Sequence, residues 1–205
     1  MTAAPHLTGF DVIEHLIGRD DLTVDDVADL PEDLHYELVH GRLVLTPSPL
    51  SIHQSICHMI HSALKASRSP DGYVSSDQSV KLDAYTERRP DVVALRATGA
   101  NRSPVFAADV LLVVEVVSSS SGVIDHEEKV KDYAYAGIPS YWIIDQKVPR
   151  ITLTQLVLGP DGNYHQVLVT DEQVTLELPW RVTLDPPAWT RERDWLDAIS
   201  QPGHR

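Results

Sequence analysis

The chain has 205 residues, a formal net charge of -13 and a pI near 5.0. Phosphate backbones repel such a negative chain, which argues against a protein that coats nucleic acid non-specifically. A hydrophobic content of 42% is enough for one substantial core, and no Pro-, Gly- or Ser-rich linker separates two comparable halves. We therefore expect a single domain over residues 1–205, in which any nucleic-acid contact is local.

Cysteine content and hydropathy bear on the compartment. The single cysteine, Cys57, excludes an internal disulfide and fits a reducing environment. The sequence shows neither an N-terminal signal pattern nor an apolar stretch approaching the roughly 18 residues that span a membrane. These features predict a cytoplasmic protein without membrane contact.

The first part of the chain predicts a helical lead-in, a hairpin and an amphipathic helix. Residues 10–33 contain a short helical pattern and an acidic, turn-rich segment. In "HYELVHGRLVLTPSP", apolar positions alternate on both sides of His40-Gly41, which indicates a hairpin with Glu37 on its first strand. Helical spacing of apolar residues predicts a helix over residues 51–66: Ile52, Ile56, Met59, Ile60, Ala63 and Leu64.

The remainder of the chain predicts a sheet with helices. "GYVSSDQSVKLDA", "RPDVVALRA", Leu111–Val117 and "SYWIID" are typical of strands, and a helix that stops at Gly137 connects the last two. A strand, helix, strand order implies a right-handed crossover and a mixed sheet. Three further strands in a meander and a C-terminal helix over "DPPAWTRERDWLDAI" follow. The expected class is α/β or α+β, with a core over residues 34–170 and a C-terminal strand and helix within 171–205.

A carboxylate, Glu115, lies in the middle of the apolar run Leu111–Val117. An unpaired buried carboxylate costs several kcal/mol, so Glu115 needs a partner such as a metal ion or a lysine. If the strand that follows Asp91 is a neighbour, both carboxylates can bind one Mg²⁺ or Mn²⁺, and the Val116 backbone carbonyl can add a ligand. Such a site would hydrolyse a phosphodiester. In the alternative, Asp91 caps a turn and Glu115 pairs with a structural lysine or arginine.

Hydrolysis at such a site also needs a cation near the carboxylates. Nucleases built on strands of this type often carry a lysine two residues after the glutamate, where this chain has Val117. On a helix that begins near Val123, Lys129 lies about 80° from the centre of the inward face, with Asp125 one turn earlier, and Lys131 lies about 120° away on the opposite flank. Geometry favours Lys129 as the replacement. The alternative is an ordinary surface pair between Asp125 and Lys129.

Several of these segments together resemble one protein family. "YELVHGRL", "PSPLSIHQSI", "RPDVVAL" and "VVEVVSSSSGVIDHEEKVKDYAYAGIPSYWIID" are similar to the Uma2 family of bacterial endonucleases, which are related to PD-(D/E)XK restriction enzymes. The resemblance covers roughly residues 30 to 170. It implies a restriction endonuclease-like fold and a Mg²⁺ site at Asp91 and Glu115. It adds Glu37 and a lysine displaced onto the helix, which matches Lys129. From the strand pattern alone, Glu37 could equally face solvent.

The chain departs from the family pattern at two places. His40 replaces the usual aspartate before the hairpin glycine, and Ser118–Ser121 replaces a Ser-Pro-Ser-Thr loop. Neither change removes a proposed ligand. His53 matches the helix histidine of the family, which implies that it approaches the site or contacts phosphate.

Other constellations compete with this interpretation. His53, Cys57 and His61 follow i, i+4, i+8 spacing, but the outer two lie about 12 Å apart along a helix, so all three cannot bind one zinc ion. Two of them could bind zinc together with a ligand from elsewhere in the chain. In the alternative, histidines at the border of an apolar face are more often partly buried helix residues than ligands. "SSSSG" lacks the Gly-x-x-x-x-Gly-Lys pattern of nucleotide-binding loops, and a Gly-x-Ser-x-Gly nucleophile motif is missing.

The sequence leaves two candidate functions. The first is a Mg²⁺-dependent endonuclease that acts on nucleic acid, with DNA expected, and as a homodimer because two sites cut two strands. The second is a catalytically silent dimeric interaction module, which the acidic charge and Val117 favour. Four arginines near Asp91 could form a local basic patch, which would support the nuclease, or only a solvated rim. They are Arg88, Arg89, Arg96 and Arg102.

Overall fold

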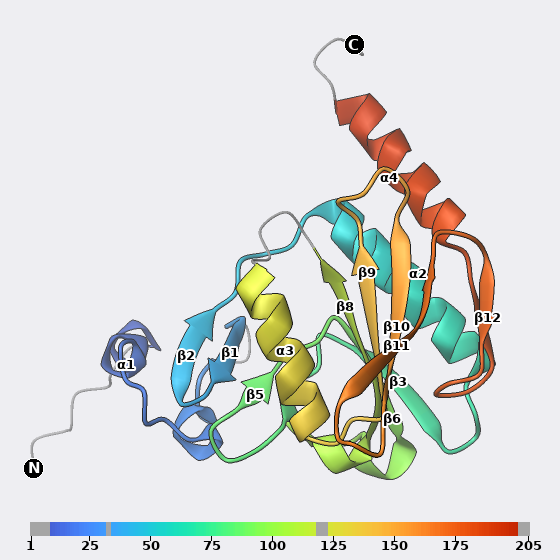
Figure 1. The fold of residues 1–205 in the computed structure, drawn as a ribbon. Coiled ribbons are helices and arrows are strands. Elements are labelled where there is room, and N and C mark those ends of the chain that lie inside the picture. Colours follow the sequence, from blue (N-terminus) through green and yellow to red (C-terminus); the bar gives the residue numbers. More distant parts are fainter. Residues whose placement is uncertain (1–8, 32–33, 118–122, 201–205) are drawn as a thin grey trace, which may run out of the picture.

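A computed structural model describes residues 9–31, 34–117 and 123–200. In these ranges a six-stranded sheet forms the centre of the molecule, in the order β11-β10-β9-β8-β6-β3 (Figure 1). Its strands are β3 (Gly72–Ser76), β6 (Val92–Arg96), β8 (Val110–Val117), β9 (Ser140–Asp145), β10 (Thr152–Leu158) and β11 (Tyr164–Thr170).

Strand directions in this sheet are mixed, as expected. β8 runs parallel to β9, and the helix α3 (Val123–Tyr135) connects them. β6 and β8 are antiparallel, with Val92 opposite Val114. The chain leaves α3 through Gly137, whose φ of 75° is accessible to glycine and ends the helix where the sequence predicted. The predicted mixed α/β architecture is therefore confirmed.

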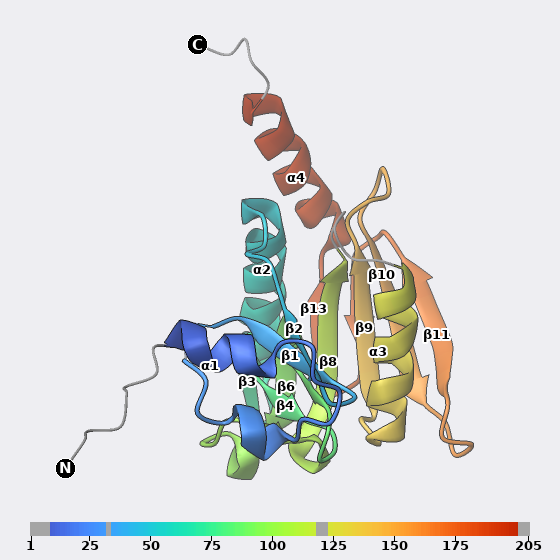
Figure 2. The same cartoon turned by 90° about the vertical axis from the view of Figure 1, so that its left-hand side faces the viewer.

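Helices cover both faces of the central sheet. The helix α2 (Ser51–Ser67) packs Ile56 and Ile60 against one face, where Val92, Ala94, Val114 and Val116 lie. Alternate residues of the same strands, Val93 and Val113 among them, face α3 and contact a second cluster with Tyr133. Figure 2 shows α2 and α3 on the two sides of the sheet. This alternation directs Glu115, two residues after Val113, toward α3.

A smaller five-stranded sheet lies beside the first, in the order β2-β1-β5-β4-β7. It consists of β1 (Tyr36–Val39), β2 (Arg42–Leu45), β4 (Val80–Lys81), β5 (Glu87–Arg88) and β7 (Val105–Phe106). The single strand predicted over residues 72–84 is wrong. The backbone turns at Asp77, where φ is 53°, and the two parts join different sheets.

The predicted hairpin at His40-Gly41 is confirmed. β1 pairs with β2 in the register Val39 to Arg42, and both turn residues have positive φ, 49° at His40 and 82° at Gly41. A side chain at Gly41 would also collide with the Asp20 carbonyl, because its Cβ would lie 2.6 Å from that oxygen. This tight turn positions the strand that carries Glu37.

The remaining elements are the N-terminal lead-in, short 3-10 turns in the middle of the chain and the C-terminal segment. The helix α1 (Gly9–Leu16) and the 3-10 helix η1 (Val24–Val27) form the lead-in, and further 3-10 turns span Ala97–Gly99 and Ala107–Asp109. β10 and β11 form the predicted hairpin, but the expected third strand of that meander, β12 (Val174–Leu176), pairs instead with β13 (Val182–Leu184). The C-terminal helix α4 (Pro186–Ser200) projects from the body (Figures 1 and 2). Of the helices in the described ranges, none has the length and apolarity to cross a membrane.

Candidate functional site

Neighbouring strands bring Asp91 and Glu115 to the same end of the sheet. Asp91 immediately precedes β6, and since Val92 lies opposite Val114, extending the antiparallel register by one residue sets Asp91 opposite Glu115. The Val116 backbone N–H donates to Asp91 Oδ2 at 2.7 Å, which holds the aspartate against β8. The expected convergence of these two strands is thus present in the fold.

Glu115 is surrounded by groups from α3. Lys129 Nζ lies 3.1 Å from each carboxylate oxygen, and the Tyr133 hydroxyl donates to Oε1 at 2.7 Å. The side chain is 12% exposed. Burial, together with the negative charges of Asp91 and Glu37, raises the pKa of Glu115 to about 7, although Lys129 and Tyr133 act in the opposite direction. Additional positive charge at this position would favour the ionised carboxylate.

Glu37 reaches the same lysine from the smaller sheet. Its side chain is buried, at 4% exposure, so it does not face solvent. Oε1 lies 3.2 Å from Lys129 Nζ and accepts the Arg89 backbone N–H at 3.1 Å. Burial acts to raise the pKa of Glu37, but Lys129 and Arg88 outweigh it and lower that pKa below its ordinary value. Lys129 therefore bridges the buried Glu37 and the largely buried Glu115.

Sequence reasoning missed a second layer of charges behind Glu37. Arg88, on β5, donates through NH1 to Glu37 Oε2 at 3.0 Å and through NH2 to Asp132 Oδ2 at 2.6 Å. His40 Nε2 lies 3.3 Å from Asp132 Oδ1. His40, the departure from the family pattern in this turn, therefore sets a nitrogen beside Asp132. One signal was available, since Asp132 follows Lys129 by three residues and so lies near it on the helix.

The arginines proposed for a basic patch contact different partners. Arg88 is 1% exposed, so its assignment to a surface patch is wrong: two buried carboxylates hold it inside the fold. Arg89 binds Asp77 at 2.6 Å, and Arg96 donates to the Ala108 carbonyl. Arg102 lies 3.8 Å from Asp109 and over the Phe106 ring.

The helix α2 contributes His53 to the site. His53 Nε2 lies 2.9 Å from Asp91 Oδ1, whereas His61 is on another part of the helix and contacts Ser76. The approach of His53 to the carboxylates, which the family resemblance implies, is present in the structure. The side chain of Asp125 and the loop Ser118–Ser121 lie outside the described residues.

The chemistry of these groups fits a hard divalent cation. Asp91 and Glu115 supply carboxylate oxygens at adjacent strand positions, and the backbone of Val116 lies beside both. The pKa of Glu115 is raised first by burial and then by the negative charges of Asp91 and Glu37, and a bound cation would offset both effects.

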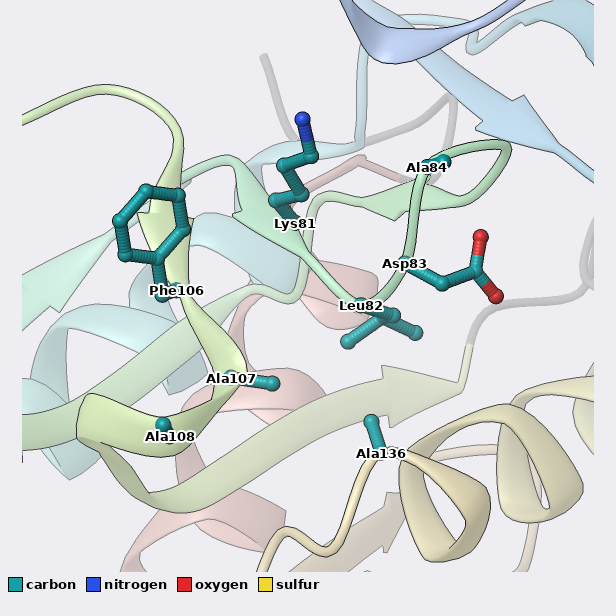
Figure 3. Close-up of a pocket in the computed structure, with 8 residues that line it drawn as sticks. All are labelled: Lys81, Leu82, Asp83, Ala84, Phe106, Ala107, Ala108 and Ala136. Carbon is teal, nitrogen blue, oxygen red and sulfur yellow. The ribbon is translucent and has the colours of Figure 1, made fainter.

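A separate depression on the surface does not include these groups. Figure 3 shows its lining, and no residue of it belongs to the site: Lys81, Leu82, Asp83, Ala84, Phe106, Ala107, Ala108 and Ala136. The candidate chemistry therefore lies at the strand ends between α2 and α3.

Comparisons with known proteins identify the fold and the family of this chain. A crystal structure described as "a putative nuclease belonging to DUF820" from Anabaena variabilis ATCC 29413 shares the fold, with a TM-score of 0.66 at 16% sequence identity, over 82% of this chain and 99% of that chain. Among curated proteins, none matches in sequence. The family model of Uma2, described as "Putative restriction endonuclease", matches residues 24–185. The match covers more than half of the chain, which belongs to the Uma2 family.

Proposed function

We propose that this protein is a Mg²⁺-dependent endonuclease that hydrolyses phosphodiester bonds of nucleic acid. One observation carries the proposal: Lys129 Nζ lies 3.1 Å from Glu115 and 3.2 Å from Glu37, beside Asp91 at the neighbouring strand end. A carboxylate pair can hold a divalent ion for metal-assisted hydrolysis, and an adjacent lysine can stabilise negative charge on the phosphate. The family description and the nuclease title of the similar structure support the same reaction class.

Each residue has a proposed role in this reaction. Asp91 and Glu115, with the Val116 backbone carbonyl, would hold Mg²⁺ or Mn²⁺. When bound, the cation lowers the pKa of a coordinated water and offsets charge on the phosphoryl oxygens. Lys129 orients the attacking water or stabilises the phosphate, and Glu37 is an auxiliary acid that holds Lys129 in place.

Four further groups are proposed to act on these residues rather than on the substrate. Arg88 fixes Glu37 through a 3.0 Å hydrogen bond, and Tyr133 fixes one oxygen of Glu115. His53 holds Asp91 from the α2 side, and Asp125 is proposed as a further auxiliary group on α3.

The proposal extends to the partner and the setting. We infer DNA as the substrate, and a homodimer, because two sites in one assembly can cut two strands. A single cysteine supports a cytoplasmic setting. The catalytic core is proposed to span residues 34–170 of one domain.

Chelation of divalent metal tests the proposal. We expect the protein to cleave plasmid DNA, single-stranded DNA or RNA in Mg²⁺ or Mn²⁺, EDTA to abolish cleavage, and added metal to restore it. Calorimetric titration with Mn²⁺ should show binding that Asp91→Asn removes and that the control Glu177→Gln, at an exposed carboxylate, retains. Cleavage that persists in EDTA contradicts the proposal. If the protein shows no cleavage and no Mn²⁺ binding, that result would favour the catalytically silent dimeric module.

A further inference from the structure

A second set of possible metal ligands lies on the α2 side of Asp91. His53 and Cys57 are four residues apart on α2, so their side chains project from the same side of the helix in consecutive turns. Both are buried, at 7% and 5% exposure. One ligand atom from each, together with an Asp91 oxygen, forms a group whose members all lie within 4.8 Å of one another. Zinc–ligand distances of about 2.0–2.3 Å require ligand atoms somewhat closer than this limit, so small side-chain rotations would bring all three onto one ion.

The imidazole of His53 supplies an independent sign of a ligand. Nε2 contacts Asp91, but Nδ1 is fully buried and has no hydrogen-bond partner in the described part of the chain. A buried polar nitrogen without a partner costs about 1–3 kcal/mol, so such atoms are rare in folded proteins. Rotation of the ring within a metal site can give one nitrogen to the ion and the other to a carboxylate or carbonyl.

We propose that His53, Cys57 and Asp91 form a binding site for Zn²⁺ or a chemically similar transition-metal ion. Thiolate and imidazole prefer such ions, whereas Mg²⁺ prefers oxygen ligands. Three protein ligands leave one tetrahedral position for water. Cys57 binds as the thiolate, so its proton passes to solvent when the ion enters. The third ligand comes from the strand entrance, which is why spacing along the helix did not reveal this site.

Asp91 would then belong to two sites with different metal preferences. Binding of Zn²⁺ on the α2 side would withdraw this carboxylate from the Mg²⁺ site on the α3 side, and so inhibit cleavage. That inhibition rests on the proposed nuclease function, whereas the binding of Zn²⁺ does not.

Spectroscopic titration of the full chain with Co²⁺, a coloured substitute for Zn²⁺, tests the site. The chain has one cysteine, so a thiolate-to-cobalt charge-transfer band in the near ultraviolet can arise only from Cys57. We expect the band at one equivalent of Co²⁺ and its loss on addition of Zn²⁺. Cys57→Ser should remove it, and His53→Gln and Asp91→Asn should weaken binding by roughly tenfold or more. His61→Ala, a matched histidine elsewhere on α2, should retain it.

Several results would overturn the site. They are absence of the band at stoichiometric Co²⁺, Co²⁺ binding that does not change in folded His53→Gln and Asp91→Asn proteins, and loss of the band in His61→Ala. Circular dichroism establishes that each variant is folded. If the band appears but no nucleic acid is cleaved, the zinc site stands and the nuclease proposal fails. If cleavage occurs, Cys57→Ser should raise the Zn²⁺ concentration that inhibits it by roughly tenfold.

Discussion

Replacing Arg88 with alanine is expected to lower the free energy of unfolding by about 3–5 kcal/mol. The guanidinium is buried between Glu37 and Asp132, which are themselves buried and to which it donates at 3.0 and 2.6 Å. After its removal, Glu37 still contacts Lys129 and Asp132 still contacts His40, but both carboxylates lose the guanidinium. The cost comes from carboxylates left in the interior without adequate partners. Urea unfolding measured by circular dichroism gives the free-energy difference.

The adjacent arginine is a matched control for this prediction. Arg89 binds Asp77, whose side chain is half exposed, so Arg89→Ala should lower the free energy of unfolding by less than about 1 kcal/mol. Equal effects of the two substitutions would show that burial of Arg88 between two carboxylates does not stabilise the fold in the way proposed. A small effect of Arg88→Ala alone would lead to the same conclusion.

Replacing Glu115 with alanine is expected to abolish Mn²⁺ binding and to reduce metal-dependent cleavage by at least about 10²–10³-fold. Glu115 is a proposed metal ligand and the main partner of Lys129, so its loss removes a ligand and releases the cation. The more conservative Glu115→Gln keeps an acceptor for the Tyr133 hydroxyl while removing the charge. Both variants should remain folded.

Calorimetry and cleavage rates measured on the same preparations check this expectation. The Glu177→Gln variant, changed at an exposed carboxylate in the C-terminal part of the chain, should bind Mn²⁺ and cleave nucleic acid as the unmodified protein does. Unchanged cleavage by folded Glu115→Ala would remove Glu115 from the reaction. Retained Mn²⁺ binding with lost cleavage would separate catalysis from the metal and assign Glu115 to positioning Lys129.

The sequence predicted the elements that depend on local pattern. Alternation around His40-Gly41 identified the hairpin, apolar spacing identified α2, and Gly137 marked the end of α3, because each signal depends on neighbouring residues. The lone carboxylate of an apolar strand identified Glu115 as a residue in need of a partner. The angular position of Lys129 on its helix indicated the direction in which that partner would be found, and the two groups are in contact.

The parts that local pattern could not predict depend on contacts between distant segments. Arg88 was assigned to a surface because nothing near it in sequence marks burial, which depends on Glu37 and Asp132, 51 and 44 residues away. The partner of β12 was missed because β13 has only 3 residues, and so short a segment gives a weak strand signal in the sequence. Cys57 and His53 acquired a third possible ligand only when the fold brought Asp91 to α2. The catalytic and metal-binding roles of Asp91, Glu115 and Lys129 remain predictions.

The most direct test of the central claim is a crystal structure of the protein soaked in Mn²⁺, with the ion located by its anomalous scattering. We expect one ion coordinated by carboxylate oxygens of both Asp91 and Glu115, with Lys129 still close to Glu115. Fully occupied Mn²⁺ elsewhere, or no ion between these two carboxylates at saturating Mn²⁺, would contradict it.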